Sequence, residues 1–158
     1  MNTAYFKSSL FKSSLALFCS FEKLLAHTKP IADMGLKLWV ANVFFKSGLT
    51  KIESFDTTLM LFEDEYAVPL LSPIFAAYLG TVAELVLPVM LVLGLGGRLI
   101  PLGLFLFNIV AAISYPDLSN AGIQDHIIWG LMLFVLMANG SGSLSIDNII
   151  SKKLFKHK

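Results

Sequence analysis

Glu84 is the one charged residue in the run 74–93, which is long enough to cross a bilayer as a helix. On insertion scales, an Asp or Lys at the centre of a membrane helix costs about 2.5–3.5 kcal/mol, so such a group usually faces a partner or a water-filled cavity. A carboxylate in that position can exchange a proton with a bound ligand. It can also act as a structural clasp that only hydrogen-bonds neighbouring helices, and the sequence leaves both interpretations open.

Other polar residues are expected near the level of Glu84. Asn42 and Glu84 each lie ten residues from the expected outer end of their helix, and Asn108 lies ten residues from the expected inner end of its own. At 1.5 Å per residue, all three then lie roughly 15 Å from a membrane surface. Lys46 lies about 6 Å nearer the outside than Glu84, a gap that its side chain can span, so one expectation is a Lys46–Glu84 ion pair. The other is a Glu84 without a cation that exchanges protons, and the sequence does not choose between these states. The candidate catalytic residue is therefore Glu84, and the candidate pocket residues are Asn42, Lys46, Lys51 and Asn108.

The composition predicts an integral membrane protein. Hydrophobic residues make up 56% of the 158 residues and charged residues 15%, with a mean hydropathy of +0.73. Soluble domains carry about 25% charged residues because their surface must meet water. The net charge of +1 gives no electrostatic reason to bind nucleic acid. We therefore expect no nucleic-acid partner, and the partner that the composition implies is the lipid bilayer.

Metal and haem chemistry is not expected. Cys19 is the single cysteine, which excludes an intramolecular disulfide and a dithiol redox centre. The three histidines are too scattered to ligate a haem from two helices, and only His126 lies near an expected span. The chain has no spacing typical of a metal site, a phosphate loop or a nucleophile elbow. Any redox chemistry would depend on a partner or a borrowed cofactor, and the sequence does not identify the cofactor.

Four segments are predicted to span the membrane and form an all-α four-helix bundle: 31–52, 74–93, 99–115 and 122–140. A re-entrant or interfacial helix is the alternative for the last of them. Lysines concentrate before the first segment and after the fourth, and Arg98 lies between the second and third. Acidic residues instead concentrate in 53–65. Because the Lys and Arg bias sets orientation, both termini are expected in the cytoplasm.

Residues 1–30 are expected to form an arm separate from the membrane domain 31–150, and residues 151–158 a basic cytoplasmic tail. Four apolar residues of the arm fall near one helical face, which predicts an N-terminal amphipathic helix on the inner leaflet. They are Leu10, Leu17, Phe21 and Leu24. A cleaved signal peptide fits less well, because no small-residue cleavage site follows the short apolar stretch. A disordered or cytosolic arm is the remaining alternative.

Three short motifs, in order along 36–150, resemble the DoxX family. The first has the family's aromatic, small, glycine and lysine pattern: Phe44, Phe45, Ser47, Gly48 and Lys51. The second has its glutamate, Leu-Gly-Leu turn and basic residue: Glu84, Leu93, Gly94, Leu95 and Arg98. The third resembles its glycine-rich closing segment: Gly140, Gly142, Leu144, Ser145 and Asp147. The family often has arginine where Lys37 stands and histidine where Ser47 stands.

The resemblance implies a multi-pass, four-helix protein of the bacterial inner (cytoplasmic) membrane. Some relatives are subunits of thiosulfate:quinone oxidoreductase, and others associate with redox or oxidative-stress enzymes. It therefore suggests quinone as the ligand of the pocket, and a protein partner or homo-oligomer. The first hypothesis is a membrane subunit, catalytic or accessory, of a quinone-linked oxidoreductase or redox-stress complex. The alternative is a non-enzymatic scaffold that anchors a partner protein, followed by a small-solute or proton carrier.

Overall fold

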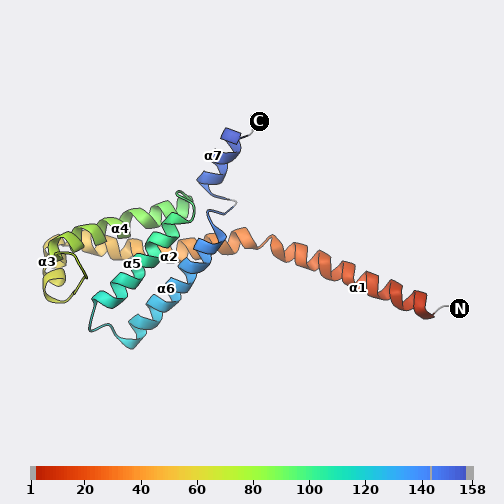
Figure 1. The fold of residues 1–158 in the computed structure, drawn as a ribbon, viewed down its shortest axis with the longest axis horizontal. Helices are drawn as coiled ribbons and strands as arrows, with labels where there is room; N and C mark the ends of the chain where they lie inside the picture. Colours follow the sequence, from red (N-terminus) through yellow and green to blue (C-terminus); the bar gives the residue numbers. More distant parts are fainter. Residues whose placement is uncertain (1–2, 143, 156–158) are drawn as a thin grey trace. The chain divides into compact units, whose positions relative to one another are not determined.

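The computed structural model describes the backbone of residues 3–142 and 144–155, and the side chains of 15–142 and 144–154. This part of the chain is all-helical and contains no strand. Its helices are α1 (Thr3–Ala26), α2 (Lys29–Glu53), α3 (Phe55–Asp64), α4 (Pro73–Leu93), α5 (Leu99–Ser114), α6 (Asn120–Asn139) and α7 (Ile146–Phe155) (Figure 1). The chain divides into two compact units, residues 1–32 and 33–158.

Local sequence signals set the ends of α4 and α6. The Ser72 hydroxyl caps α4 by accepting the backbone N–H of Phe75, and Pro73 follows at the first helical position. Helix α4 ends at Gly94, whose φ of 64° is a conformation that glycine adopts without strain. The Ser119 hydroxyl caps α6 in the same way by accepting the N–H of Gly122.

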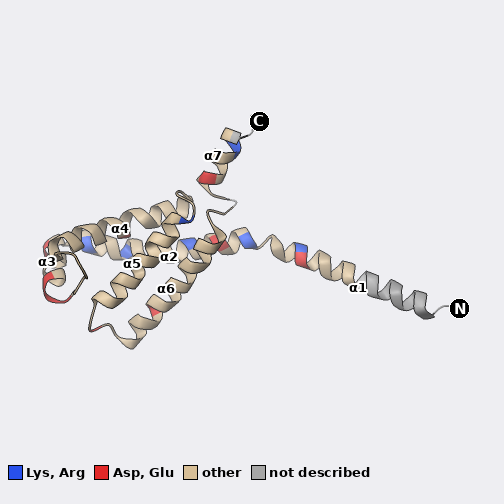
Figure 2. Cartoon of the chain, viewed as in Figure 1, with Lys and Arg blue, Asp and Glu red and all other residues tan. Residues whose placement is uncertain are grey.

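Helices α4 and α6 are long and apolar enough to cross a membrane. Only 39% of the apolar window of α4 and 17% of that of α6 are buried, whereas the core helix of a soluble protein would be mostly buried. Helix α5 is apolar but shorter. Figure 2 shows that α4, α5 and α6 carry few charged residues, whereas α2 carries several. The four predicted spans coincide with α2, α4, α5 and α6 to within two residues at each end.

The core of the second unit is built from side chains of four helices. They are Val40 and Phe44 of α2, Leu91 of α4, Leu104 of α5, and Leu133 and Leu136 of α6. A second buried cluster joins Phe62 of α3 to Ala76 and Ala77 of α4. Helix α3 is therefore packed on α4, near the start of that helix. We refer to this end of the unit as the α3 end, and to the end formed by the Gly94–Arg98 turn and residues 140–142 and 144–147 as the α7 end.

Two helices were not expected from the sequence. No helix is predicted between the first two spans, where the acidic residues concentrate, but Phe55–Asp64 forms α3 and buries Thr58 and Phe62. These two residues lie four apart, so they share one face of the helix while the acidic residues face outward. Helix α7 likewise follows the glycine-rich segment, where only a closing stretch and a tail were expected.

The first unit is dominated by α1, which is helical from Thr3 to Ala26. Leu17, Phe21 and Leu24 of the predicted amphipathic face are exposed. The side chain of Leu10, the fourth residue of that face, lies outside the described residues. The helix is thus present, and its contact with a membrane remains a prediction.

Candidate functional site

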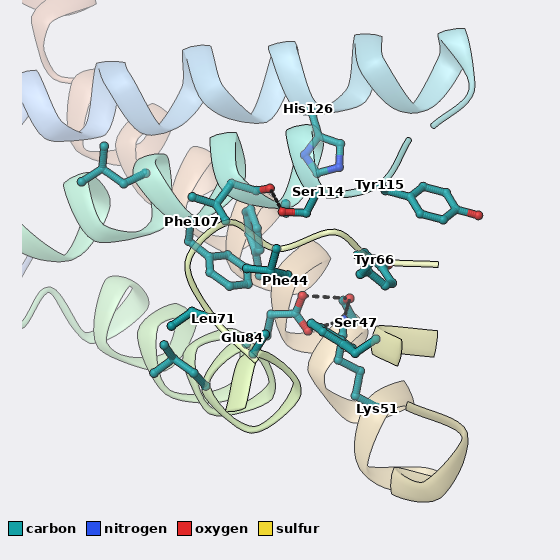
Figure 3. Close-up of a pocket in the computed structure, with 18 of the residues that line it drawn as sticks. Phe44, Ser47, Lys51, Tyr66, Leu71, Glu84, Phe107, Ser114, Tyr115 and His126 are labelled. Atoms are coloured by element: carbon teal, nitrogen blue, oxygen red, sulfur yellow. Dashed lines mark hydrogen bonds and ion pairs between the residues drawn. The ribbon is translucent and has the colours of Figure 1, made fainter. Parts of the chain in front are cut away.

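A cavity of about 450 Å³ lies at the α3 end of the second unit. Side chains of α2 to α6 and of the loop between α3 and α4 line it (Figure 3). Most of its wall is apolar, with six aromatic residues: Phe44, Phe62, Tyr66, Phe107, Tyr115 and Trp129. Its polar groups are few, and the charged ones come from α2 and α4.

Glu84 supplies the negative charge of the cavity and is 6% exposed. Its Oε2 lies 2.7 Å from the Nζ of Lys51 in an ion pair that joins α4 to α2. Its Oε1 accepts a hydrogen bond of 3.2 Å from the Ser47 hydroxyl. Lys51 Nζ also donates to Ser47 Oγ at 2.9 Å, so the three side chains form a closed polar triad. The triad places one carboxylate, one ammonium group and one hydroxyl against the same apolar space.

The spacing of residues on α2 assembles this triad. Ser47 and Lys51 are four residues apart and therefore lie on one helical face. Gly48 lies beside them, and a Cβ added there would come within 2.9 Å of Leu85 and 3.1 Å of the Glu84 Cβ. The missing side chain at Gly48 thus lets α4 approach α2 closely enough for the ion pair to form.

The loop between α3 and α4 covers the cavity at the α3 end. Tyr66 stacks on Phe62 at 4.7 Å between ring centroids and lies 5.2 Å from the ring of Tyr115. The Ala67 N–H donates to the backbone oxygen of Ser114 at 2.8 Å, which ties the loop to the end of α5. Burial, followed by the nearby Glu84 charge, raises the pKa of Tyr66. The Tyr66 phenol therefore stays neutral beside the cavity over the physiological pH range.

His126 forms part of the wall contributed by α6, and its ring projects toward the cavity (Figure 3). Its Nδ1–H donates to Asn108 Oδ1 at 2.9 Å, and Asn108 Nδ2 donates to the backbone oxygen of His126, also at 2.9 Å. The ring packs edge-on against Trp129 at 4.9 Å. The His126–Asn108 pair therefore joins α5 to α6 beside the cavity.

The structure brings together some of the predicted pocket residues and separates others. Lys51 and Glu84 meet at the cavity. Asn42 and Lys46 are exposed on α2, away from it, and Asn108 is buried against His126. Of the two states expected for Glu84, the carboxylate has a cation, but that cation is Lys51 and not Lys46. Lys46 does not reach Glu84 because it lies on another face of α2, and Asn42 is not level with Glu84 because the helix ends are not level. Gly48, six residues beyond Asn42, lies opposite Glu84, an offset of about 9 Å.

A second buried ion pair, at the α7 end, was missed in the sequence. Lys37 Nζ lies 3.0 Å from Asp33 Oδ2 and donates to the backbone oxygen of Ser141 at 2.7 Å. A Cβ on Gly142 would come within 2.7 Å of the same Asp33 oxygen. The i, i+4 spacing of Asp33 and Lys37 was the available signal. It was overlooked because Asp33 lies near the start of the expected span.

Further contacts hold residues 142 and 144–147 at this end. Asp147 Oδ2 accepts the Gly97 N–H at 2.7 Å, and Ser145 Oγ donates to the Gly142 oxygen at 2.8 Å. Ser145 also accepts the backbone N–H of Asn148, which caps α7. The glycine-rich segment is therefore bonded to the turn between α4 and α5. Among the described residues, no group of three or more His, Cys, Asp or Glu side chains could hold a metal ion.

The fold and the cavity define a class: an all-helical protein with helices long and apolar enough to cross a membrane, a buried ion pair and an aromatic cavity. A comparison with family models matches residues 32–116 to DoxX, and the chain belongs to the DoxX family. The match covers α2 to α5 and includes Ser47, Lys51 and Glu84. No curated protein and no solved structure matches the chain.

Proposed function

We propose that this protein is a membrane subunit of a quinone-linked oxidoreductase and binds a quinone-type ring in the cavity at the α3 end. The observation that carries this proposal is the Lys51–Glu84 ion pair at the wall of an aromatic cavity of about 450 Å³. Small-molecule sites commonly have volumes of about 300–1,000 Å³, apolar and aromatic walls, and a few fixed polar groups. A quinone ring needs flat apolar surfaces for its faces and hydrogen-bond donors for its carbonyl oxygens.

The three polar side chains have distinct roles in this proposal. The Lys51 ammonium group donates to one ring carbonyl and stabilises negative charge that develops on its oxygen during reduction. Glu84 exchanges a proton with the ring oxygen, and Ser47 keeps the carboxylate and the ammonium group in register. Reduction of a quinone to a quinol takes two electrons and two protons. Each proton comes from water, which protonates Glu84 before the carboxyl group passes the proton to a ring oxygen. The electrons come from a partner oxidoreductase, as in the thiosulfate:quinone oxidoreductases that contain DoxX relatives.

The membrane arrangement that accompanies this proposal has four crossings, by α2, α4, α5 and α6. Both termini face the cytoplasm of a bacterium, with residues 1–30 on the inner leaflet, 31–150 in the bilayer and 151–158 as a basic tail. The lysine distribution supports this orientation. Ion pairing supports α2 as a crossing, since two of its lysines, Lys37 and Lys51, have carboxylate partners. The cavity then lies in the outer half of the membrane.

Binding of a short-chain benzoquinone to the purified chain in nanodiscs tests the proposal. The chain has two tryptophans, and Trp129 lines the cavity while Trp39 is exposed on α2. A Trp39→Phe background therefore leaves Trp129 as a fluorescence reporter at the site. We expect saturable quenching by the quinone. Lys51→Met or Glu84→Gln in this background should weaken binding by about tenfold, the loss of one hydrogen bond to a charged group.

Lys46→Met is the matched control, because Lys46 is a lysine of the same helix that is exposed and lines no part of the cavity. It should leave the affinity unchanged. If Glu84→Gln and Lys51→Met bind the quinone as tightly as the parent, the triad has only a structural role, which is to hold α2 and α4 together. A parent protein with no saturable quenching would exclude the cavity as a quinone site.

A scaffold is the second candidate function, and the acidic surface at the α3 end favours it. Glu53, Asp56, Glu63, Asp64 and Glu65 are all exposed there. Such a surface suits a basic partner at the outer face of the membrane. Reversal of three of these charges to lysine would abolish capture of the partner in a scaffold, but would leave quinone binding in the cavity intact.

A further inference from the structure

The wall of the cavity between α4 and α5 differs from its other walls. The two helices separate as they leave the Gly94–Arg98 turn and run toward the α3 end (Figure 1). Leu79 of α4, and Leu106 and Val110 of α5, line the cavity there. The same three residues are 50%, 54% and 38% exposed on the surface of the unit. We call these three residues the α4–α5 window, because they face both the cavity and the outside.

The other walls carry contacts that close them. The loop bonded through Ala67 and Ser114 covers the α3 end. The double hydrogen bond between Asn108 and His126 joins α5 to α6. Gly48 brings α2 directly against α4. The α4–α5 window is apolar and faces outward from two helices that carry almost no charge, so it opens toward lipid and not toward water.

We infer that the ligand enters the cavity sideways from the bilayer core through the α4–α5 window, and that it is a lipid-soluble amphiphile. Its polar ring lies beside Glu84 and Lys51, and its long hydrocarbon tail leaves between Leu79, Leu106 and Val110. This inference rests on the proposed function and adds the chemical class of the ligand and its route.

The charges at the site favour an uncharged head group. Lys51 and Glu84 compensate each other at 2.7 Å, so the pair offers no net charge to a phosphate or another anion. An uncharged ring with hydrogen-bonding oxygens can insert against the pair without leaving a charge unpaired. A single tail also suits the window, which is bounded by three side chains from two helices. A phospholipid, with an anionic phosphate and two chains, matches neither feature.

Two ligands with the same ring test the route: a benzoquinone with a long isoprenoid tail and one with no tail. Their affinities are measured in nanodiscs by isothermal titration calorimetry, a readout that an added tryptophan does not alter, for the Trp39→Phe parent and for Leu106→Trp, which fills the window. The tailed quinone should bind Leu106→Trp about tenfold more weakly than the parent, through lost contacts of the tail. The tail-less quinone should change by less than about twofold. Ile109→Trp is the matched control, because Ile109 is exposed on α5 but lines a different groove.

Each other outcome has a definite meaning. If the parent binds neither quinone, the proposed function itself fails. If both ligands bind and Leu106→Trp affects neither, or weakens both equally while thermal unfolding stays unchanged, the tail does not leave through the window. Native mass spectrometry of the purified parent gives an independent readout. A phospholipid retained by the parent, but lost on Leu106→Trp and not on Ile109→Trp, would assign the window to a lipid and overturn the inference.

Discussion

Two buried ion pairs with the same chemistry lie near opposite ends of the second unit, and the space around them differs. Lys37–Asp33 at the α7 end and Lys51–Glu84 at the α3 end each join a lysine of α2 to a carboxylate, at 3.0 Å and 2.7 Å. The space beside Lys37 has a volume of about 10 Å³, about that of one water probe. The space beside Lys51 has about 450 Å³. A buried ion pair is therefore not enough to identify a ligand site in this fold. The free volume beside the pair distinguishes a candidate ligand site from an ion pair that only holds helices and loops together, which we call a structural lock.

The Lys37–Asp33 pair is a structural lock because the segment that follows α6 packs directly against it and leaves no room for a ligand. Ser141 gives Lys37 a backbone acceptor, and Gly142 lies directly on the Asp33 carboxylate. The side chains of Lys37 and Asp33 are 5% and 9% exposed. Asp33 Oδ1 is buried and has no hydrogen-bond partner among the described residues. The pair is therefore incompletely satisfied, and its net stabilisation is smaller than the damage caused by removing one partner.

The largest expected effect is the difference between Lys37→Met and Lys51→Met in the free energy of unfolding. Removal of Lys37 leaves a buried carboxylate without a cation and should cost about 3–5 kcal/mol. Removal of Lys51 leaves Glu84 beside a cavity that can admit water, with Ser47 still donating to it, and should cost about 1–3 kcal/mol. Unfolding of the full chain in mixed micelles, followed by circular dichroism, measures both values.

Double substitution checks the cause of this difference. Asp33→Asn combined with Lys37→Met removes both charges and should recover part of the loss caused by Lys37→Met alone, because no unpaired charge remains. Lys46→Met serves as the control for loss of an exposed lysine from α2. If Lys37→Met and Lys51→Met lower the free energy of unfolding by the same amount, the two ion pairs do not differ as a structural lock and a ligand site.

The next largest effect concerns two glycines, one beside each ion pair. Gly142 has a φ of 78°, and its added Cβ would come within 2.7 Å of Asp33 Oδ2. Gly142→Ala should therefore cost about 2–4 kcal/mol, from the left-handed backbone and the contact with a fixed carboxylate. Gly48→Ala meets Leu85 Cδ2 and Cγ at 2.9 Å and Glu84 Cβ at 3.1 Å, but it gains helix propensity and has no left-handed backbone, so it should cost about 1–3 kcal/mol.

The two glycine variants should also differ in function. Gly48→Ala pushes α4 from α2 and lengthens the Lys51–Glu84 contact, so quinone affinity should fall although the protein stays folded. Gly142→Ala lies at the α7 end and should lower stability without a specific loss of affinity. Thermal unfolding and Trp129 quenching, both measured on each variant, separate the two effects. Loss of affinity in Gly142→Ala alone would reverse the assignment of the two ends.

The sequence predicts the helices better than it predicts their contacts. Ser72, Pro73 and Gly94 mark the ends of α4 through local chemistry, and the helix is found within one residue of its expected start. The position of Glu84 within an apolar run likewise predicted a buried charge that faces a partner or a cavity. The expectation of Lys46 rather than Lys51 as its cation rested on depth along α2 and not on the face of the helix. Ser47 shares a helical face with Lys51, so a polar face formed by these two residues would have favoured Lys51 as the partner of Glu84.

The features that could not be predicted from the sequence depend on contacts between segments that are far apart in the chain. The position of Ser141 against Lys37 depends on how residues 140–142 and 144–147 fold back, and no pattern within α2 contains that information. Helix α3 was not predicted because its sequence is rich in acidic residues. The helix is positioned by Phe62, which packs against Ala76 and Ala77 of α4. Tyr66 belongs to none of the sequence motifs and was not among the predicted pocket residues. It lines the cavity because Ala67 bonds to Ser114 and draws the loop over it.

The smallest expected effect is a dependence on alkaline pH that should be confined to the α3 end. The carboxylate of Glu65, which lies beside Tyr115, raises the pKa of the Tyr115 phenol above its ordinary value of 10.0. The folded state thus holds this proton more tightly than the unfolded state does. The stabilisation is fully present below pH 10.0 and is lost as the pH rises through the folded pKa. Because Tyr115 contacts Tyr66, its ionisation should loosen the loop over the cavity.

Absorbance at 295 nm measures the ionisation, and the difference between the parent and Tyr115→Phe isolates Tyr115. We expect that difference curve to have its midpoint above pH 10.0, and Glu65→Gln to move it back toward 10.0, because the neutral amide removes the repelling charge. Trp129 quenching by the quinone should weaken over the same pH range in the parent and not in Tyr115→Phe. A difference curve centred on 10.0 in the parent would mean that Glu65 does not act on Tyr115. Ionisation of Tyr115 would then not make quinone binding at the α3 end depend on pH through Glu65.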